Sequence, residues 1–523
     1  MSEEKWEQAC RESDLREGVP HLVRLGKRSV LLALVDGEIH AVGGKCPHYG
    51  APLHEGVLLG SRLTCPWHTA RFDVTTGTAV SPPAFDDLAQ YAVKRENGTV
   101  YVKRLERPAE EIELRPDKGT FLVAGGGAAG FAAAVTLRKE GFDGRVIIAT
   151  AEVELPYDRP SLSKEFLAGD MKPEWVPLKE ERFYVDLKIE IFSGHQVYAV
   201  EPERREVLFA NSATLRYDKL LLATGGVPRT PDIPGVHMPS FYLLRSFEDA
   251  RAIRSALEEG RRAVIIGAGF IGLEAAAALR TRGLEVHVVA PEKLPMGGLF
   301  GERVAARLLK MHRDRGVQVH LEVYPEEIRG EADVESVVLS DETVLPADLV
   351  VAGIGVVPAV HFLESAGVVE EGAVPVDRML RTKTEHIYAA GDIAAVPHPV
   401  TGKRRRVEHW VEAQRQGQHA ARAMLGFSGE YREAPFFWTS QYGTTLTCVG
   451  DSGGHTRIAY RGDPGGESFL AGYYRGKRLE AAAGVGRAGE IILIGELLKR
   501  GVSPGVKELQ NESFDLRELL QDE

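Results

Sequence analysis

The sequence predicts a multidomain protein with an N-terminal all-β domain, two parallel α/β domains and a smaller C-terminal α+β domain. The chain has 523 residues, enough for roughly three to four domains at about 150 residues each. Its first hundred residues alternate between short apolar strands and turn signals, whereas two later stretches join an apolar strand, a glycine-rich turn and an Ala-rich helix. Beyond about residue 430 the pattern changes to strands followed by one amphipathic helix. Alternation favours antiparallel sheets, and strand–helix repetition favours parallel ones.

Composition narrows the class of protein further. Hydrophobic residues make up 44% and charged residues 27% of the chain, which is ordinary for a globular protein and excludes a disordered or collagen-like one. The net charge of -11 argues against a nucleic-acid partner. The sequence lacks an apolar run of the roughly 18–20 residues that cross a bilayer, and its polar N-terminus does not resemble a signal peptide. We therefore expect a cytoplasmic protein without a membrane span, and homodimer formation stays open.

The all-β domain is predicted over residues 1–106. The stretches SVLLALVDGEIHAVGG and YAVKRENGTVYVKRL each place an Asp-Gly or Asn-Gly pair, Asp36-Gly37 and Asn97-Gly98, between two apolar runs. Such pairs favour the tight turns of β-hairpins. Charge and proline content then rise in ERPAEEIELRPDKG, which predicts an exposed linker over 107–119.

Four metal-ligating residues lie in two short motifs of this domain. Cys46 and His48 form Cys-Pro-His, and after sixteen further residues Cys65 and His68 form Cys-Pro-Trp-His. Two cysteines and two histidines could hold one tetrahedral zinc ion. They could equally hold a 2Fe-2S cluster, with both cysteines on one iron and both histidines on the other.

The spacing of these ligands, with Gly-Ala-Pro-Leu after the first motif and F-D-x-x-x-G after the second, resembles a Rieske ferredoxin-type domain. The respiratory type of Rieske domain has an additional cysteine in each loop, and both are absent from this chain. The resemblance implies a 2Fe-2S cluster held by Cys46, His48, Cys65 and His68.

Two glycine motifs predict two Rossmann-like nucleotide-binding units. Each follows an apolar strand and begins a helix, where the glycines allow a tight turn, close approach of a pyrophosphate, and close packing of helix on strand. The first motif consists of Gly125, Gly127 and Gly130, and the second of Gly267, Gly269 and Gly272. Two units imply two dinucleotides, a flavin and a nicotinamide, although one nucleotide beside a degenerate unit stays open.

The segments LPYDRPSLSK, ATGGVPR and IYAAGDIAAVP are similar to those by which two-dinucleotide flavoprotein reductases hold FAD. The whole chain resembles the apoptosis-inducing-factor-like branch that fuses a Rieske domain to a ferredoxin-reductase-type flavoprotein. This resemblance implies an FAD-binding domain in two parts, an NAD(P)-binding domain and a C-terminal domain, over 120–247 with 371–428, 248–370 and 429–523. It also implies FAD contacts from Arg159, Thr224, Gly225, Gly391 and Asp392.

An acidic residue at the end of the second strand of each unit is expected to bind the adenosine ribose. Glu152 meets this expectation in the first unit. In the second unit Ala290 stands where NADH users of the family usually have a carboxylate, and Glu292 and Lys293 follow. We therefore expect NADH or NADPH as the reductant, with NADH favoured.

Lys164 and Glu274 match the positions of a Lys–Glu pair beside the reactive edge of the flavin in the family, and we expect them to be catalytic. A positive charge there would favour electron density on the flavin. His409, Trp410 and Trp438 resemble flavin-lining residues, although aromatic residues at such positions can also be core.

Two other activities are excluded by what the chain lacks. No cysteine lies between Cys65 and Cys448, so a flavin-adjacent disulfide or thiolate mechanism is excluded. Rieske oxygenases hold a further iron with two histidines five residues apart, and none of the 16 histidines has such a partner.

We therefore predict an NAD(P)H-dependent FAD oxidoreductase that passes electrons through its own 2Fe-2S cluster to an unidentified acceptor such as a redox protein. FAD suits this role because it exchanges both hydride and single electrons. The alternative is an NAD(P)H-responsive redox sensor or scaffold with slow turnover.

Overall fold

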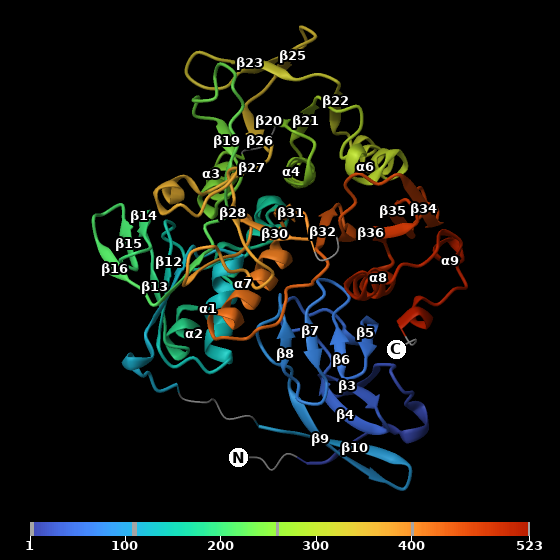
Figure 1. The fold of residues 1–523 in the computed structure, drawn as a ribbon. Helices are drawn as coiled ribbons and strands as arrows, with labels where there is room; N and C mark the ends of the chain where they lie inside the picture. The colour runs from blue at the N-terminus through green and yellow to red at the C-terminus, as the bar shows by residue number, and fades with distance from the viewer. Residues whose placement is uncertain (1–4, 107–111, 258–260, 399–401, 521–523) are drawn as a thin grey trace.

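The computed structural model describes residues 5–106, 112–257, 261–398 and 402–520. It contains an all-β part, two parallel α/β parts and a C-terminal α+β part (Figure 1), so the predicted multidomain fold is confirmed. Residues 107–111 of the predicted linker lie outside the described residues, while Glu113 to Arg115 are exposed. Within the described ranges, no helix is long and apolar enough to cross a membrane.

The N-terminal part consists of two antiparallel sheets. Both predicted hairpin turns form, because Asp36 and Asn97 adopt positive φ of 51° and 50° and each is followed by a glycine. The larger sheet has the order β1-β10-β9-β4-β3-β2 and the smaller one β5-β6-β7-β8. Their strands are β1 (Glu7–Arg11), β2 (His21–Leu25), β3 (Arg28–Val35), β4 (Glu38–Gly43), β5 (Val57–Leu59), β6 (Arg62–Thr64), β7 (Arg71–Asp73), β8 (Ala79–Ser81), β9 (Gln90–Glu96) and β10 (Thr99–Arg104).

The first α/β part is a parallel sheet of order β13-β12-β11-β17-β29. Its last strand, β29, comes from a segment far along the chain and pairs with β17, where Ile387 lies opposite Leu220. The polypeptide therefore returns to this sheet after forming the second one. Helices α1 (Ala128–Lys139) and α7 (Trp410–Met424) pack against each other beside it. The strands are β11 (Thr120–Ala124), β12 (Arg145–Ala149), β13 (Ile189–Phe192), β17 (Lys219–Leu222) and β29 (Ile387–Ala389).

The second α/β part repeats this plan, with a parallel sheet of order β19-β26-β20-β21-β22. Its strands are β19 (Phe241–Leu243), β20 (Arg262–Ile266), β21 (Glu285–Ala290), β22 (Gln318–Leu321) and β26 (Leu349–Ala352), and its helices include α3 (Phe247–Ser255), α4 (Phe270–Thr281), α5 (Gly297–Phe300) and α6 (Glu302–Arg313). Smaller antiparallel pieces accompany the two parts: β14 (Val197–Glu201), β15 (Glu206–Phe209) and β16 (Thr214–Arg216), then β23 (Pro325–Arg329), β24 (Ser336–Leu339) and β25 (Val344–Pro346).

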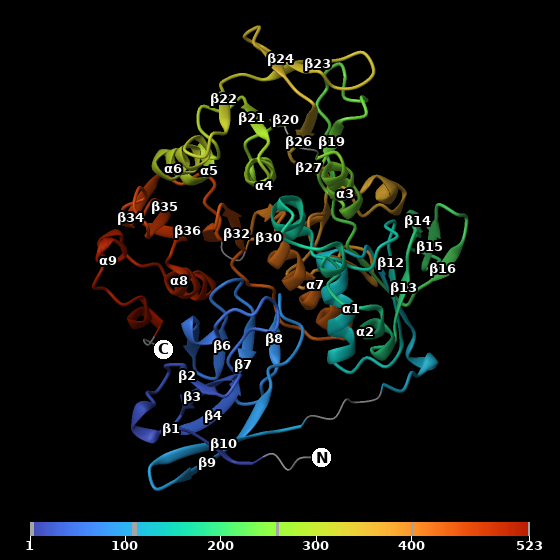
Figure 2. The same cartoon turned by 180° about the vertical axis from the view of Figure 1, so that it is seen from behind.

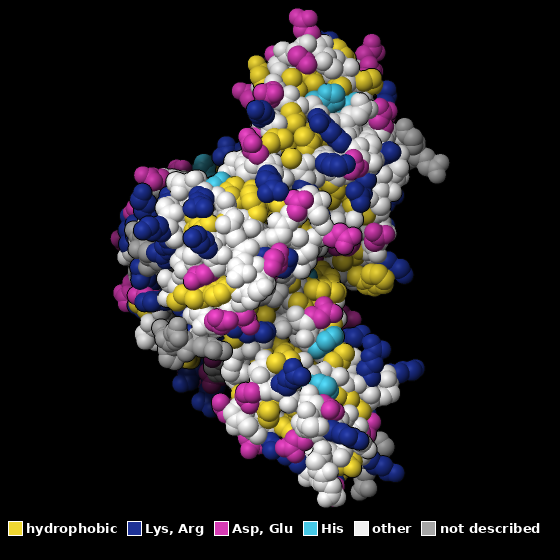
Figure 3. Space-filling view, turned by 90° about the vertical axis from the view of Figure 1, so that its right-hand side faces the viewer, with side chains coloured by type: hydrophobic (Ala, Val, Ile, Leu, Met, Phe, Trp, Pro, Cys, Tyr) yellow, Lys and Arg dark blue, Asp and Glu magenta, His cyan; other side chains and the backbone are white. Residues whose placement is uncertain are grey.

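The C-terminal part is an antiparallel sheet of order β32-β33-β36-β35-β34 with helix α8 (Ala488–Arg500) packed on β33 and β36. Its strands are β32 (Phe436–Gln441), β33 (Thr444–Gly450), β34 (Arg457–Gly462), β35 (Phe469–Arg475) and β36 (Arg478–Val485). Strands β5–β8 lie next to α7 and α8 when the molecule is seen from the front and from behind (Figures 1 and 2). Acidic and basic side chains are interspersed on the face shown in Figure 3.

Candidate functional site

The two Cys/His motifs form loops of the same design. In the loop after β4, the backbone N–H of Cys46 donates to Ala51 and that of Gly50 donates to Cys46. In the loop between β6 and β7, the backbone N–H of Cys65 donates to Ala70 and that of Thr69 donates to Cys65, at the same sequence spacings. Both cysteines are buried. Repeated loop geometry brings one thiol and one imidazole from each motif to the same place.

The four predicted ligand side chains are arranged as a cysteine pair and a histidine pair. The Nδ1 atoms of His48 and His68 are 3.2 Å apart, a separation that suits two imidazoles bound to one metal at about 2.0–2.1 Å. Burial, followed by the charge of Lys179, lowers the pKa of His48 to about 3, so the imidazole is in the neutral, metal-binding form. The thiols of Cys46 and Cys65 contact each other through a side-chain hydrogen bond.

This pairing fits a two-iron cluster better than a single zinc ion. Zinc held by four side chains requires all of them to converge on one point. Across the part of the chain that the structure describes, no three His, Cys, Asp or Glu side chains do so. A 2Fe-2S cluster needs two protein ligands on each iron, and the separate cysteine and histidine pairs match that requirement.

A cavity of about 1000 Å³ lies between the two α/β parts and the C-terminal sheet. Its wall includes residues that the sequence assigned to FAD and to the catalytic pair. The lining residues include Gly125, Gly127, Glu152, Arg159, Lys164, Thr224, Gly225, Gly269, Glu274, Gly391, Asp392, His409, Trp410 and Trp438.

The first glycine turn has the shape of a phosphate cradle. Gly125 adopts φ of 117°, and a Cβ there would lie 2.2 Å from the carbonyl oxygen of Ala223. A Cβ on Gly130 would lie 1.9 Å from the carbonyl oxygen of Gly125, whereas one on Gly127 would meet nothing within 4 Å. Gly127 precedes α1 as an N-cap without a side-chain hydrogen bond, so the helix N-terminus is open to an anion.

The second glycine turn repeats this geometry. Gly267 adopts φ of 105°, and a Cβ on Gly272 would lie 2.0 Å from the carbonyl oxygen of Gly267. Gly269 has open space around it and caps α4 without a side-chain hydrogen bond. Both cradles contribute to the cavity lining, the first through Gly125 and Gly127 and the second through Gly269, and together they fit two dinucleotides.

Charged residues at the first cradle are held by one another. Arg159 donates to Glu152 at 2.8 Å, and Arg245 donates to Asp392 at 2.8 Å. Burial alone would raise the pKa of Glu152, but Arg159 holds it below its usual value. The Glu152 carboxylate is therefore an anionic acceptor on the cavity wall, which Asp392 also lines.

Lys164 and Glu274 form the ion pair expected from the resemblance, with 3.0 Å between Nζ and Oε2. Lys164 comes from a π-helical turn over Leu162–Phe166 and Glu274 from α4, so the pair joins the two α/β parts. Glu274 also accepts hydrogen bonds from Ser163 at 2.5 Å and Thr439 at 2.8 Å. A buried carboxylate with three donors has a fixed orientation.

Three aromatic residues predicted to lie beside the flavin, His409, Trp410 and Trp438, line the cavity. His409 stacks on Phe437, with ring centroids 4.0 Å apart and planes at 14°, and burial lowers the pKa of His409 to about 4. The indole N–H of Trp410 is buried and has no hydrogen-bond partner, so it suits a ligand with acceptor atoms. Trp438 lines the cavity and also contacts His68, with ring centroids 4.3 Å apart.

The residues expected to choose between NADH and NADPH lie away from this cavity. Ala290 is fully buried at the end of β21. Glu292 and Lys293 are exposed, and neither lines the cavity. The structure therefore does not bring Glu292 together with the other predicted ligands.

Residues that hold the N-terminal part against the others were not identified from the sequence. Tyr49 donates to Asp158 at 2.7 Å, and Arg415 donates to the hydroxyl of Thr69 at 2.8 Å. Arg71 forms two hydrogen bonds with Glu433 at 2.9 and 2.8 Å. Partners this far apart in the sequence leave no local pattern from which they could have been found.

Comparisons with known proteins agree with this geometry. Residues 120–417 match the family model described as pyridine nucleotide-disulphide oxidoreductase, residues 5–92 match the Rieske [2Fe-2S] domain, and residues 436–520 match the reductase C-terminal domain. The family name refers to disulfides, but none of the four cysteines, all of which lie in the described residues, lines the cavity.

Two relatives and one solved structure illustrate the similarity. The chain is 37% identical to apoptosis-inducing factor 3 of Homo sapiens over 94% of this chain and 84% of that protein. It is 34% identical to the ferredoxin--NAD(+) reductase component of an anthranilate 1,2-dioxygenase system from Burkholderia cepacia, over 76% of this chain and 99% of that one. The crystal structure of the ferredoxin reductase for the CYP199A2 system from Rhodopseudomonas palustris superimposes with a TM-score of 0.74 and 34% identity, covering 76% and 99% of the two chains.

Proposed function

The chain belongs to the pyridine nucleotide-disulphide oxidoreductase family, and from that premise we propose that it passes electrons from NAD(P)H through FAD to its own Rieske cluster and then to an external acceptor. It is a ferredoxin-reductase-like NAD(P)H oxidoreductase with a Rieske domain. The observation that carries the proposal is the contact of His68 with Trp438, since Trp438 also lines the cavity. One aromatic ring thus touches both the flavin cavity and a cluster ligand.

We assign the dinucleotides to the two cradles as follows. Residues 120–247 and 371–428 would hold FAD, with its pyrophosphate at the Gly125–Gly130 turn and the α1 N-terminus. Residues 248–370 would hold the nicotinamide nucleotide at the Gly267–Gly272 turn. FAD supplies the exchange between two-electron hydride chemistry and one-electron transfer. Glu152 and Asp392 line the cavity, and their carboxylate oxygens would accept hydrogen bonds from hydroxyl groups of the flavin nucleotide.

Lys164 places a positive charge beside the cavity, and Glu274 holds that charge in position. A fixed cation favours electron density on a group bound next to it. Lys164 and Glu274 are therefore proposed to assist hydride acceptance electrostatically. Because Glu274 comes from the second α/β part, the pair forms only when both parts are packed together.

His48 and His68 set the direction of electron flow. Imidazole ligands hold a Rieske centre at roughly -150 to +300 mV, above the about -400 mV of plant-type ferredoxins. Electrons therefore move favourably from the nicotinamide side towards the histidines. Tyr49 and Arg71 hold the histidine edge against the flavin side, so transfer occurs within one chain and does not require an encounter between molecules.

The nicotinamide preference and the acceptor belong to this proposal too. NADH is favoured, because no arginine immediately follows Ala290 to bind a 2'-phosphate. The acceptor is proposed to be a separate redox protein, in keeping with the relatives that are named ferredoxin reductases.

Anaerobic stopped-flow mixing with NADH tests the function. We expect flavin absorbance to fall first and cluster absorbance second, with a second rate that is independent of protein concentration. A second rate proportional to protein concentration would show transfer between molecules and contradict the proposal. A reduced flavin–nicotinamide complex that persists without turnover of one-electron acceptors would instead support the sensor or scaffold function.

A further inference from the structure

A chain of buried polar side chains leads away from Glu274 into the C-terminal part. The hydroxyl of Thr439 donates to Glu274 Oε1 at 2.8 Å. Gln441 Nε2 donates to Thr439 Oγ1 at 3.0 Å, and Gln441 Oε1 is 2.8 Å from Nε2 of His312. Thr439 and Gln441 are 2% exposed and His312 is 0% exposed. The proposed electron-transfer function gives Gln441 and His312 no role.

Every donor in this series of hydrogen bonds points towards the Glu274 carboxylate. Burial lowers the pKa of His312, so its ring is neutral and carries one N–H. Because Gln441 uses its N–H₂ group on Thr439, its oxygen must accept from His312 Nε2–H. His312 Nδ1 is then an acceptor, and the hydroxyl of Tyr442 lies 3.5 Å from it. Donors aligned in one direction polarise one another and strengthen the last bond, here the bond to Glu274.

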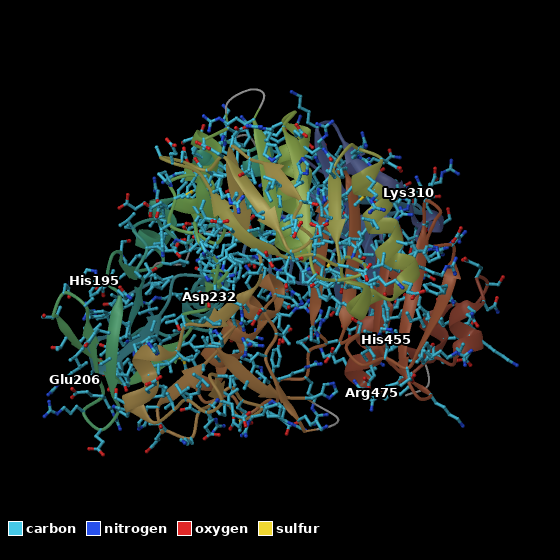
Figure 4. The ribbon with its side chains drawn as sticks, turned by 90° about the horizontal axis from the view of Figure 1, so that it is seen from above. His195, Glu206, Asp232, Lys310, His455 and Arg475 are labelled. Carbon is cyan, nitrogen blue, oxygen red and sulfur yellow. The ribbon has the colours of Figure 1, made fainter. Side chains whose placement is uncertain are left out.

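This series of hydrogen bonds connects α4, α6 and β32, three elements that lie far apart in the sequence. Thr439 and Gln441 are two residues apart on β32 and therefore share one face of the strand. His312 lies on α6, whose apolar face packs on the C-terminal sheet through Val304 and Leu308. Figure 4 marks α6 with Lys310 beside the strands of that sheet. The hydrogen bonds to Glu274 thus depend on how α6 and β32 pack together.

We propose that Gln441 and His312 are positioning residues that hold the Glu274 carboxylate, and through it the Lys164 ammonium, in the orientation needed beside the flavin. This inference rests on the proposed function, because it presumes that Lys164 acts on bound FAD. Glu274 has one oxygen for Lys164 and Ser163 and the other for Thr439. Loss of the hydrogen bond from Thr439 leaves Oε1 of Glu274 unheld, so the carboxylate can rotate and Lys164 moves with it.

The test uses the full-length holoprotein and a nearly isosteric pair of variants, Thr439→Val and Thr439→Ser. Valine removes the hydroxyl while serine keeps it. We expect each of three single variants, Thr439→Val, Gln441→Met and His312→Phe, to lower the midpoint potential of bound FAD. We also expect these three variants to slow hydride transfer from NADH about three- to tenfold, less than loss of a donor that contacts the reacting group directly. The dissociation constant of NADH should not change. Thr439→Ser should keep the wild-type midpoint potential and the wild-type rate of hydride transfer.

Ser440→Ala is the matched control. Ser440 lies between the two chain residues on β32 but points to the other face, where it bonds Thr445 at 2.7 Å. This variant should keep the wild-type potential and rate. If Gln441→Met and Thr439→Val also kept them, or if Thr439→Ser behaved like Thr439→Val, the positioning role would be wrong. Failure of the wild-type protein to be reduced by NADH would instead defeat the proposed function, so the two failures are distinguishable.

Discussion

The imidazole of His68 lies against the indole of Trp438, with ring centroids 4.3 Å apart and ring planes at 46°. One residue belongs to the N-terminal all-β part and the other to the first strand of the C-terminal sheet. Trp438 also lines the cavity that we assign to FAD. The proposed cluster ligand His68 therefore faces the cavity side in the packed structure, and the proposed electron transfer would not need the N-terminal part to move towards the cavity.

Replacing Trp438 with leucine should slow electron transfer to the cluster and leave flavin reduction by NADH nearly unchanged. Leucine keeps an apolar side chain but removes the ring that contacts His68. We expect the second stopped-flow phase to slow about tenfold, since small losses of contact at a reacting interface have large effects on rate. Equal slowing of both phases would show that Trp438 acts on flavin reduction as well.

His68→Ala should abolish the 2Fe-2S cluster while reduction of FAD by NAD(P)H persists. The cluster needs both imidazoles on one iron, whereas the cavity is built from other residues. Iron content and the electron paramagnetic resonance signal measure the loss. His54→Ala is the control, because His54 lies near the first motif but is not a proposed ligand. A His68→Ala protein that retained the signal would overturn the ligand assignment.

Ala290→Glu should sharpen the preference for NADH. Ala290 is fully buried, so the new side chain must extend outward from the end of β21, where its carboxylate would accept hydrogen bonds from both ribose hydroxyls and repel a 2'-phosphate. We expect the ratio of kcat/KM for NADH to that for NADPH to rise about tenfold, which is the size of one such interaction. If the ratio did not change, the adenosine ribose would bind elsewhere.

Glu433→Gln should loosen the N-terminal part. Arg71 is buried between Glu433 and Glu496, and Lys499 lies 2.9 Å from Glu433. Removing one partner of a buried ion pair costs about 3–5 kcal/mol. Small-angle X-ray scattering and limited proteolysis should show a more open chain. The control Glu12→Gln breaks an exposed ion pair with Arg95. We expect it to lower the free energy of unfolding by at most about 1 kcal/mol.

The same interface should weaken in acid. Burial alone would raise the pKa of Glu433, but Arg71 and Arg415 hold it well below its usual range. A carboxylate with a lowered folded-state pKa stabilises the structure at pH values above about 4.3, the unfolded-state pKa of glutamate. That stabilisation is lost as the pH falls towards the folded-state pKa. Scattering measured from neutral to acidic pH should show opening only at the acidic end, and an unchanged profile in Glu433→Gln would contradict this account.

The sequence by itself determined the features that depend on a few neighbouring residues. The Asp36-Gly37 and Asn97-Gly98 turns form as predicted, because positive φ is a local property of those residues. The motifs at 46–48 and 65–68 carried the resemblance to a Rieske domain, since the ligand spacing of each loop is local and each loop closes with hydrogen bonds between nearby backbone groups. The resemblance of short segments anticipated that Lys164 and Glu274 would meet, which the structure shows.

Only the tertiary structure decided how the parts meet. The contacts of His68 with Trp438, Arg71 with Glu433 and His312 with Gln441 each join elements from distant segments. Such contacts depend on how whole faces pack, and periodicity along one segment carries no information about the face that another segment presents to it. Likewise Glu292, which follows Ala290 by two residues, lies exposed and outside the cavity.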